Sequence, residues 1–397
     1  MYDFIESAGE RVKIKGYWRP DGKFGIRNHV LILPCSLCAS ETARFAADNV
    51  EGAVYMANQG GCSLSKRDLK VTLETLSGVA ANPNVYGTIV IGNGCEVVQA
   101  SLLAEKIREK TCKPLEVLVI REEEGSLNTA ARAAKLAEKM RKEADQLLQE
   151  EGDVSQLILG TECGGSDPTS GLAANPVVGC CSDILIDHGG TVILSETPEM
   201  IGAEQILAER CETRQIKDKL LSTIKSFEED FLKVGENPRS GNPTPGNIAG
   251  GITTLEEKSL GCIHKGGSRK IREVVDYGES VTKKGLVVMD TPGQDVASIV
   301  GMAAGGAQIA VFTTGHGTPT GSGIIPVIKI TANEETARKM RDHIDFDCSD
   351  VLTDGKDMKK SGEELFQFVV ETACMKETKA EKLGFQDVSI ARYCNFA

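Results

Sequence analysis

Residues 160–176, GTECGGSDPTSGLAANP, gather a cysteine, two carboxylates and several hydroxyls among glycines. The apolar run Leu157–Leu159 directly precedes them, which predicts that this chemistry follows a buried strand. In open parallel sheets, ligands bind beyond the carboxyl ends of the strands. Glycine at that position lets backbone N–H groups approach a ligand closely and cradle an anion. The segment therefore predicts a site for a small, oxygen-rich, anionic ligand.

Four further glycine-rich turns of this kind occur in the chain, and three of the five carry a cysteine. Cys62, Cys95 and Cys163, on separate loops at one sheet edge, could together hold a soft metal or an iron–sulfur cluster. It is equally open that these three cysteines lie in turns and share no site, because spacing along the sequence alone fixes no geometry. The other four turns are NQGGCSLS (58–65), GNGCE (92–96), TPGNIAGG (244–251) and TTGHGTPTGSG (313–323).

The remaining cysteines carry weaker signals. Cys35 and Cys38 form a C-x-x-C, which occurs in redox and metal sites, but no second pair completes a zinc motif. Six cysteines have no convergent polar neighbours and are predicted to be small core residues. These are Cys112, Cys211, Cys262, Cys348, Cys374 and Cys394.

The elements that must position these turns alternate along the chain. Near-continuous apolar runs, such as 29–36 and 309–315, predict buried strands, and amphipathic stretches, such as 66–81 and 294–305, predict helices. This alternation is typical of a mostly parallel sheet covered by helices on both faces. The predicted fold class is therefore α/β, with two doubly wound, Rossmann-like domains.

Composition shifts place the domain boundary. A long charged helix is predicted at 126–150, and the strand–helix alternation restarts after it, which gives domains 1–150 and 151–397. The second domain carries three of the glycine-rich turns. Within it, the segment 235–251 is too rich in Gly, Pro and Asn for regular structure and is predicted to be a loop.

Charge and hydropathy exclude several classes of partner. The chain has 397 residues and a net charge of −12, which argues against nucleic acid and anionic membranes as partners. No apolar stretch approaches the roughly 20 residues of a membrane span, and the charged start MYDFIESAGERVKIKG does not suit a signal peptide. We expect a cytoplasmic protein whose cysteines are thiols or ligands rather than disulfides.

Five blocks of the sequence together resemble the altronate/galactarate dehydratase family. They lie in order between residues 14 and 331, so the resemblance covers nearly the whole chain. Members of that family are similar to iron-dependent hydro-lyases, which convert sugar acids to 2-keto-3-deoxy acids. The blocks are GYWRPDGKFGIRNHVLILP, GNGCE, ECGGSDPTSGLAANPVVG, GNPTPGNIAGGITTLEEKSLG and FTTGHGTPTGSGIIPVIKI.

The resemblance implies a reaction in which a proton is removed next to a carboxylate and a β-hydroxyl leaves. Such a reaction needs a base, an electrophile for the aci-carboxylate and help for the leaving group. Fe²⁺ is the implied cofactor, with an iron–sulfur cluster or another divalent metal as alternatives. The implied base or metal-ligand candidates are Glu162, Asp167 and Glu96, with His316 as a further catalytic candidate. The implied substrate contacts are Arg27 and Lys258 for the carboxylate, and Asn28, Ser166, Thr169, Ser170, Asn175, Asn247 and Thr318 for hydroxyls.

Two departures from the family pattern bear on function. Long altronate dehydratases carry a small, histidine-containing domain ahead of the GY-R-DG segment, whereas this chain has no histidine before His29. Because it lacks such a histidine-containing segment, this chain resembles the large subunit of sulfolactate sulfo-lyase, and the resemblance implies a separate small subunit. We also expect a homo-oligomer. In addition, His316 stands where altronate enzymes more often have arginine.

Three functions remain open on the sequence alone. The first is a hydro-lyase acting on an altronate-like aldonate or aldarate. The second is a sulfo-lyase that cleaves the C–S bond of a 3-sulfo-2-hydroxy acid, and the third is a non-catalytic protein that binds sugar acids.

Overall fold

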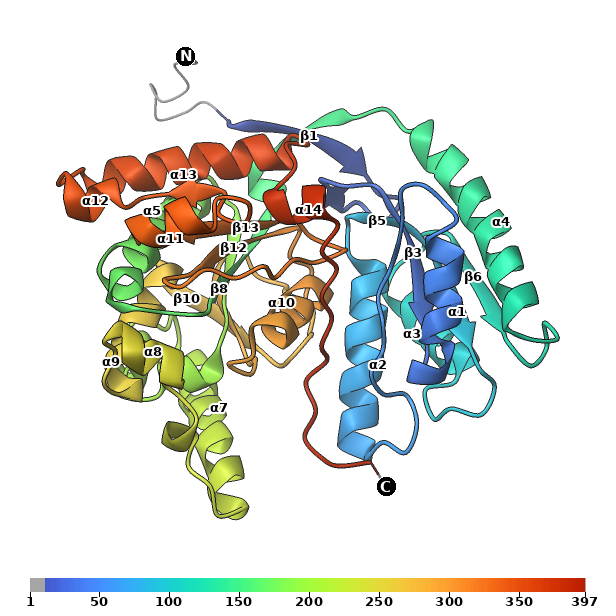
Figure 1. Ribbon diagram of the computed structural model, residues 1–397, viewed down its shortest axis with the longest axis horizontal. Helices are drawn as coiled ribbons and strands as arrows, with labels where there is room; N and C mark the ends of the chain where they lie inside the picture. Colours follow the sequence, from blue (N-terminus) through green and yellow to red (C-terminus); the bar gives the residue numbers. More distant parts are fainter. Residues whose placement is uncertain (1–10, 397) are drawn as a thin grey trace.

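The computed structural model describes residues 11–396 and confirms an α/β fold built on parallel sheets (Figure 1). The amino-terminal sheet has four parallel strands in the order β4-β3-β5-β6. Its strands are β3 (His29–Pro34), β4 (Ala53–Tyr55), β5 (Val85–Gly92) and β6 (Leu115–Val119).

Helices cover both faces of this sheet because its central strands are apolar on both sides. Val30, Ile32 and Ile89 pack with α1 and α4 on one face, and Leu31 and Val90 pack with α2 and α3 on the other. The helices are α1 (Leu37–Ala47), α2 (Lys66–Ala81), α3 (Ala100–Lys110) and α4 (Ser126–Asp145).

The carboxy-terminal sheet has seven parallel strands in the order β10-β11-β9-β8-β12-β13-β14. The central strands β8, β9, β11 and β12 consist almost wholly of buried residues, as the apolar runs predict. The strands are β8 (Ile158–Cys163), β9 (Thr191–Leu194), β10 (Ile271–Val275), β11 (Gly285–Met289), β12 (Ile309–Thr313), β13 (Val327–Thr331) and β14 (Phe346–Asp347).

Helices α5 and α13 lie on one face of this sheet, and α10 lies on the other. No described helix is both long and apolar enough to cross a membrane. The helices of this domain are α5 (Asn175–Asp187), α6 (Glu204–Glu209), α7 (Arg214–Lys233), α8 (Pro245–Gly250), α9 (Leu255–Cys262), α10 (Asp295–Ala304), α11 (Glu334–Lys339), α12 (Asp350–Thr353), α13 (Met358–Ala373) and α14 (Lys379–Leu383).

A third, antiparallel sheet was not predicted from the sequence. It has the order β2-β1-β7 and consists of β1 (Lys13–Trp18), β2 (Phe24–Gly25) and β7 (Glu150–Asp153). Gly16 and Gly152 face the Phe24 ring so closely that an added Cβ would lie within 2.9 Å of it. These short, polar strands lack the apolar alternation that marks a strand in a sequence.

The predicted loop at 235–251 is partly wrong, since α8 lies within it. Thr244 and Asn247 form a capping box, in which each side chain accepts a hydrogen bond from the other residue's backbone N–H. Pro245 occupies the first turn, where its missing N–H costs nothing. Composition hid this helix because it has only six residues and is held by its cap rather than by an apolar face.

The two domains share a continuous core rather than a flexible junction. Helices α2 and α10 pack so closely that an added Cβ on Gly78 would lie 2.4 Å from the Ala304 carbonyl oxygen. The Asn82 side chain donates to the carbonyls of Ala303 and Ala307 across the same interface. The carboxy-terminal segment runs down between the domains beside α2 (Figure 1), where the Tyr393 N–H donates to Asp68.

Arg27 and Asn28 are part of this framework, and their predicted substrate contacts are wrong. The buried Arg27 guanidinium forms a bidentate ion pair with Glu381 at 2.7 and 3.0 Å, and it also donates to the Thr372 carbonyl. The Asn28 amide bonds to Arg19 and to the Ala144 carbonyl. Both side chains therefore fasten distant segments together instead of facing a ligand.

Candidate functional site

The carboxy-terminal sheet reverses its strand order between β8 and β12, which is where open α/β sheets bind ligands. The chain runs from β8 to β9 on one side and later returns to β12 on the other. Glu162 and Cys163 are the last two residues of β8, so the register places both at this point. Both are fully buried.

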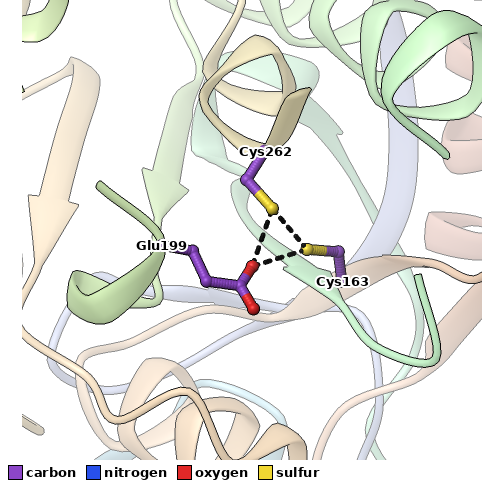
Figure 2. A group of neighbouring side chains, drawn as sticks. All are labelled: Cys163, Glu199 and Cys262. Atoms are coloured by element: carbon purple, nitrogen blue, oxygen red, sulfur yellow. Dashed lines mark hydrogen bonds between the residues drawn. The ribbon is translucent and has the colours of Figure 1, made fainter. Parts of the chain in front are cut away.

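Two thiols and a carboxylate form the centre of the site (Figure 2). The Cys163 sulfur lies 3.0 Å from Glu199 Oε2 and 3.1 Å from the Cys262 sulfur, and Cys262 donates to the same oxygen at 2.7 Å. Glu199 follows β9 in a short helical turn, Thr197–Met200, and Cys262 ends α9. The prediction that Cys262 is a core residue without polar neighbours is therefore wrong.

Two buried lysines reach the same cluster from the α9 region. Lys258 Nζ lies 2.5 Å from Glu199 Oε1, and Lys265 Nζ forms an ion pair with Glu196 Oε2. Glu196 Oε2 also accepts a hydrogen bond from the Cys163 N–H at 2.9 Å. Glu196 has a φ of +68°, a backbone conformation that costs a non-glycine residue about 1–3 kcal/mol and is characteristic of functional sites.

The carboxyl groups of this cluster are held in different protonation states. Burial, and then the charges of Glu196 and Asp295, raise the pKa of Glu162 well above its usual value, so it carries a proton. Burial, and then the charge of Glu199, raise the pKa of Glu196 to about 7. Burial alone would raise the pKa of Glu199, but the Lys258 ammonium outweighs burial and lowers this pKa to about 2.

The spacing of Cys163, Glu199 and Cys262 suits a metal ion, but their surroundings do not. They are the one group of described residues with three potential ligand atoms within 4.8 Å of one another. However, the Lys258 and Lys265 ammoniums already neutralise Glu199 and Glu196. A divalent cation would therefore lie beside two buried positive charges without water to screen them. The cluster is better suited to proton transfer than to holding Fe²⁺.

The glycine-rich loop after β8 is organised by Asp167, which is not free to act as a base. Its carboxylate accepts hydrogen bonds from Thr169 Oγ1 at 2.6 Å, from the Ser170 N–H at 3.2 Å and from Asn333 Nδ2 at 2.8 Å. Asp167, Thr169 and Ser170 therefore shape the loop by local hydrogen bonds, as Asp commonly does in turns.

Several other predicted residues gather around this loop. Asn247 Nδ2 donates to the Ser166 carbonyl at 2.9 Å, and the His316 N–H donates to the Gly165 carbonyl at 2.8 Å. The exposed His316 ring lies 3.1 Å from the Gly246 carbonyl oxygen. Thus Ser166, Asn247 and His316, which are far apart in the sequence, lie side by side. The predicted roles of Ser166 and Asn247 in substrate binding and of His316 in catalysis stay predictions.

Three buried polar atoms near the cluster have no hydrogen-bond partner among the described residues. They are Oε1 of Glu162 and the hydroxyl oxygens of Ser166 and Ser259. Buried polar groups in native proteins are nearly always paired. Their isolation marks where a hydroxyl-rich ligand would supply the missing partners.

Asn175 and Thr318 contribute to structure rather than to this ligand. Asn175 accepts from Thr313 Oγ1 at 2.6 Å and donates to the Gly261 carbonyl, which ties α5 to β12 and α9. Thr318 Oγ1 donates to Thr320 at 2.9 Å. Their predicted hydroxyl-binding roles are therefore not supported by their contacts.

The predicted metal trio is divided between the two domains. Cys163 bonds to Cys262 and Glu199, whereas Cys62 and Cys95 lie in loops of the amino-terminal domain. Glu96 is also not a base, since its buried carboxylate accepts from the backbone N–H groups of residues 93, 94 and 95 at 2.8–3.0 Å. A metal site shared by Cys62, Cys95 and Cys163 therefore stays a prediction, without a contact among the described residues that joins the three sulfurs.

Sequence reasoning missed Glu196, Glu199, Lys265 and Cys262. Glu196 and Glu199 lie within five residues of the end of β9, so the rule that placed Glu162 also applied to them. The α9 region offered no comparable signal, because the sheet register does not fix how a helix packs over it.

A substitution at Gly164 tests how tightly the cluster is built. An added Cβ would lie 2.4 Å from Oδ2 of Asp295. Burial, and then the charge of Glu199, raise the pKa of this carboxyl group to about 6. We expect G164A to displace this carboxylate, to lower activity and to cost about 1–3 kcal/mol of stability. The matched control is G246A, where the nearest atom to the new Cβ is 3.8 Å away. Equal activity and melting temperature in both variants would show that the packing is not critical.

Comparisons with known proteins can now be set against this geometry. A model of the C-terminal domain of D-galactarate/altronate dehydratase matches residues 154–395, and one of the second domain of D-galactarate dehydratase/altronate hydrolase matches residues 16–145. Altronate dehydratase of Escherichia coli K12 is 35% identical, over 98% of this chain and 79% of its own length. (2R)-Sulfolactate sulfo-lyase subunit beta of Chromohalobacter salexigens is 37% identical, over 95% of this chain and 96% of its own. Galactarate dehydratase (L-threo-forming) of Escherichia coli K12 is 33% identical, over 80% of this chain and 62% of its own length.

Proposed function

Since this chain belongs to the D-galactarate/altronate dehydratase family of lyases, we propose that it removes water from a sugar acid to give a 2-keto-3-deoxy acid. One observation carries the proposal: carboxyl groups in different protonation states lie beside two buried ammoniums at the sheet's switch point. Environments that push pKa values apart separate an acid from a base at one site.

Glu196 is the proposed general base. A pKa of about 7 matches a group that must be ionised in neutral water yet basic enough to accept a proton. It would remove the proton at the carbon next to the substrate carboxylate. The electron pair of that C–H bond then moves into the carboxylate, and the Lys258 and Lys265 ammoniums stabilise the growing negative charge.

Glu162 is the proposed general acid. Burial, and then the charges of Glu196 and Asp295, keep its proton in place at neutral pH, although a hydrogen bond from Ser298 opposes this. The hydroxyls of Ser195 and Ser298 donate to Oε2 at 3.0 and 2.5 Å and orient the carboxyl group. Its proton would leave with the β-hydroxyl as water, and the resulting enol would rearrange to the 2-keto acid. The unpaired hydroxyls of Ser166 and Ser259 would bind the remaining substrate hydroxyls.

Access to the cluster is proposed from the cleft between the domains. A cavity of about 970 Å³ lies there and is lined in part by Asp290 and Thr291. Thr291 Oγ1 accepts the Glu196 N–H at 2.7 Å, so this cavity wall directly adjoins the proposed base. Four basic side chains and five carboxylates line this cavity, so access to the base, and not the charge of the lining, supports its role as the entrance.

A second candidate function is C–S cleavage. It is favoured by the likeness to (2R)-sulfolactate sulfo-lyase subunit beta, which covers 96% of that relative's length. The same base and ammoniums would serve, but sulfite would leave in place of water.

A test incubates the chain anaerobically with altronate, galactarate and sulfolactate, with and without Fe²⁺. Keto acid from a sugar acid supports dehydration, sulfite supports the alternative, and tight binding without turnover supports a binding protein.

The pH dependence follows from the two carboxyl groups. The base must be ionised, so kcat/KM should fall as the pH drops below about 7, the pKa of Glu196. Because the pKa of Glu162 is raised, the acid stays protonated at neutral pH, and the profile should fall again only on the alkaline side. A pH–rate profile of the wild type and of E196Q checks this. An unchanged acidic limb in the variant would contradict the assignment of Glu196.

The likeness to a named subunit beta also leads us to propose a protein partner. We expect the chain alone to turn over slowly and to gain activity with a separately expressed small domain of about 80–100 residues. Activity measured across a titration of that partner checks this expectation. Full turnover by the chain alone, unchanged by the partner, would rule the partner out.

A further inference from the structure

The amino-terminal sheet has its own switch point, and three thiols lie there. Its strand order reverses at β3, which lies between β4 and β5. Cys38 lies in the first turn of α1 after β3, Cys62 follows β4 and Cys95 follows β5. Each of the three adjacent strands therefore delivers one cysteine to the edge where such sheets bind ligands.

Backbone hydrogen bonds hold these three loops together. The Leu37 N–H donates to the Gly60 carbonyl at 2.9 Å, and the N–H groups of Val97 and Val98 both donate to the Gly61 carbonyl at 2.9 and 3.0 Å. Gly61 has a φ of +98°, and an added Cβ would lie 2.3 Å from the Cys35 carbonyl oxygen. The loops are thus fixed against each other without any side chain between them.

The thiols remain accessible to a ligand. Cys38 and Cys95 are exposed, and Cys62 is half-buried. Asn93 Nδ2 donates to the Cys95 sulfur at 3.1 Å, the kind of hydrogen bond that tunes sulfur ligands in iron–sulfur proteins.

A second observation points to a missing ligand. Ser36 is the N-cap of α1, yet its side chain caps no backbone N–H, and its buried hydroxyl has no partner among the described residues. This hydroxyl lies beside Gly61, where an added Cβ would be 2.6 Å from Ser36 Cβ. An unpaired buried hydroxyl between the loops of Cys38 and Cys62 is expected where a polar or ionic group belongs.

Thiol spacing distinguishes a cluster from a single ion. Tetrahedral thiolate ligands about 2.3 Å from one zinc ion lie about 3.8 Å apart. Cys38, Cys62 and Cys95 do not form a group in which all three sulfurs lie within 4.8 Å of one another, so at least one pair of these sulfurs is farther apart than that. A polynuclear centre spans the larger separation.

We propose that Cys38, Cys62 and Cys95 bind an iron–sulfur cluster at the switch point of the amino-terminal sheet. The three thiols would bind as thiolates and release their protons to water when iron and sulfide are supplied. Three protein ligands leave one iron open. A cavity of about 670 Å³, lined by Gly60, Gln294 and the tail segment 388–395, lies beside these loops between the domains. This proposal goes beyond the acid–base cluster and does not depend on the lyase reaction.

Anaerobic reconstitution with ferrous and ferric iron and sulfide, which together supply the oxidation states of a cluster, tests the proposal on the full chain. After desalting, iron and sulfide are quantified, and visible absorption and the electron paramagnetic resonance spectrum of the reduced protein are recorded. We expect stoichiometric iron and sulfide in the wild type. C38S, C62S and C95S should each fall to the level of the triple variant. C112S, an exposed cysteine of the same domain, and C163A, in the buried cluster, should retain wild-type amounts.

Alkylation of the wild type gives a readout that needs no variant. Cys38 and Cys95 should react with iodoacetamide in the apo protein and be protected after reconstitution, as mass spectrometry would show. The proposal is overturned if no iron is retained, if the three serine variants retain wild-type iron, or if iron binds without sulfide as a single ion. Loss of iron in C163A but not in C62S would place the metal in the other domain instead.

Discussion

The E196Q variant should lose about 10²-fold or more in kcat, the usual contribution of a general base. The amide keeps the shape of the side chain and can still accept a hydrogen bond from Lys265, but it cannot take up the substrate's α-proton. Keto-acid formation under saturating substrate measures the effect. E209Q is the matched control, because Glu209 is an exposed residue at the end of α6. Wild-type turnover in E196Q would remove Glu196 from the mechanism.

Loss of folding must be separated from loss of chemistry in this variant. Removing one partner of a buried ion pair costs about 3–5 kcal/mol, because the other charge stays buried without compensation. The double variant E196Q/K265M removes both charges, so its unfolding free energy should recover toward that of the wild type. Its activity should not recover. A stable double variant with restored turnover would contradict the proposed roles of both residues.

The R27M variant should lower the free energy of unfolding by about 3–5 kcal/mol, since it leaves the Glu381 carboxylate unpaired in a largely buried position. Denaturant unfolding measures this loss. The remaining folded protein should keep the wild-type KM, because the guanidinium is fully engaged by the framework. R44M is the control, since Arg44 pairs with Glu41 and Asp48 on an exposed helix surface, and little change is expected. A raised KM with unchanged stability would restore the role in substrate binding that the sequence suggested.

Much of the fold could be predicted because its signals are local. The predicted helix at 66–81 coincides with α2, and the strand predicted at 309–315 contains β12 (Ile309–Thr313). Apolar runs reveal buried parallel strands directly. The antiparallel sheet of β1, β2 and β7 was not predicted because it depends on tertiary packing, and the short helix α8 was not predicted because it depends on a cap rather than on periodicity.

The site was predicted in part for the same reason. Glu162 and Cys163 follow from the rule about strand ends, and Lys258 was implied by the family resemblance. Cys262 and Lys265 come from a region that folds over the sheet edge, and their spacing along the chain does not report that placement. Asp167 and Glu96 have the right chemistry for a base, but their carboxylates are occupied by loop hydrogen bonds that only the structure shows.

The central claim is that Glu196 removes the substrate's α-proton inside the buried cluster. The most direct measurement is hydrogen exchange at that carbon, followed by NMR with the sugar acid dissolved in D₂O. E162Q, which keeps the base but lacks the acid, is predicted to exchange the α-hydrogen for deuterium while forming little keto acid. E196Q is predicted to do neither. Exchange in E196Q at the wild-type rate would contradict the account.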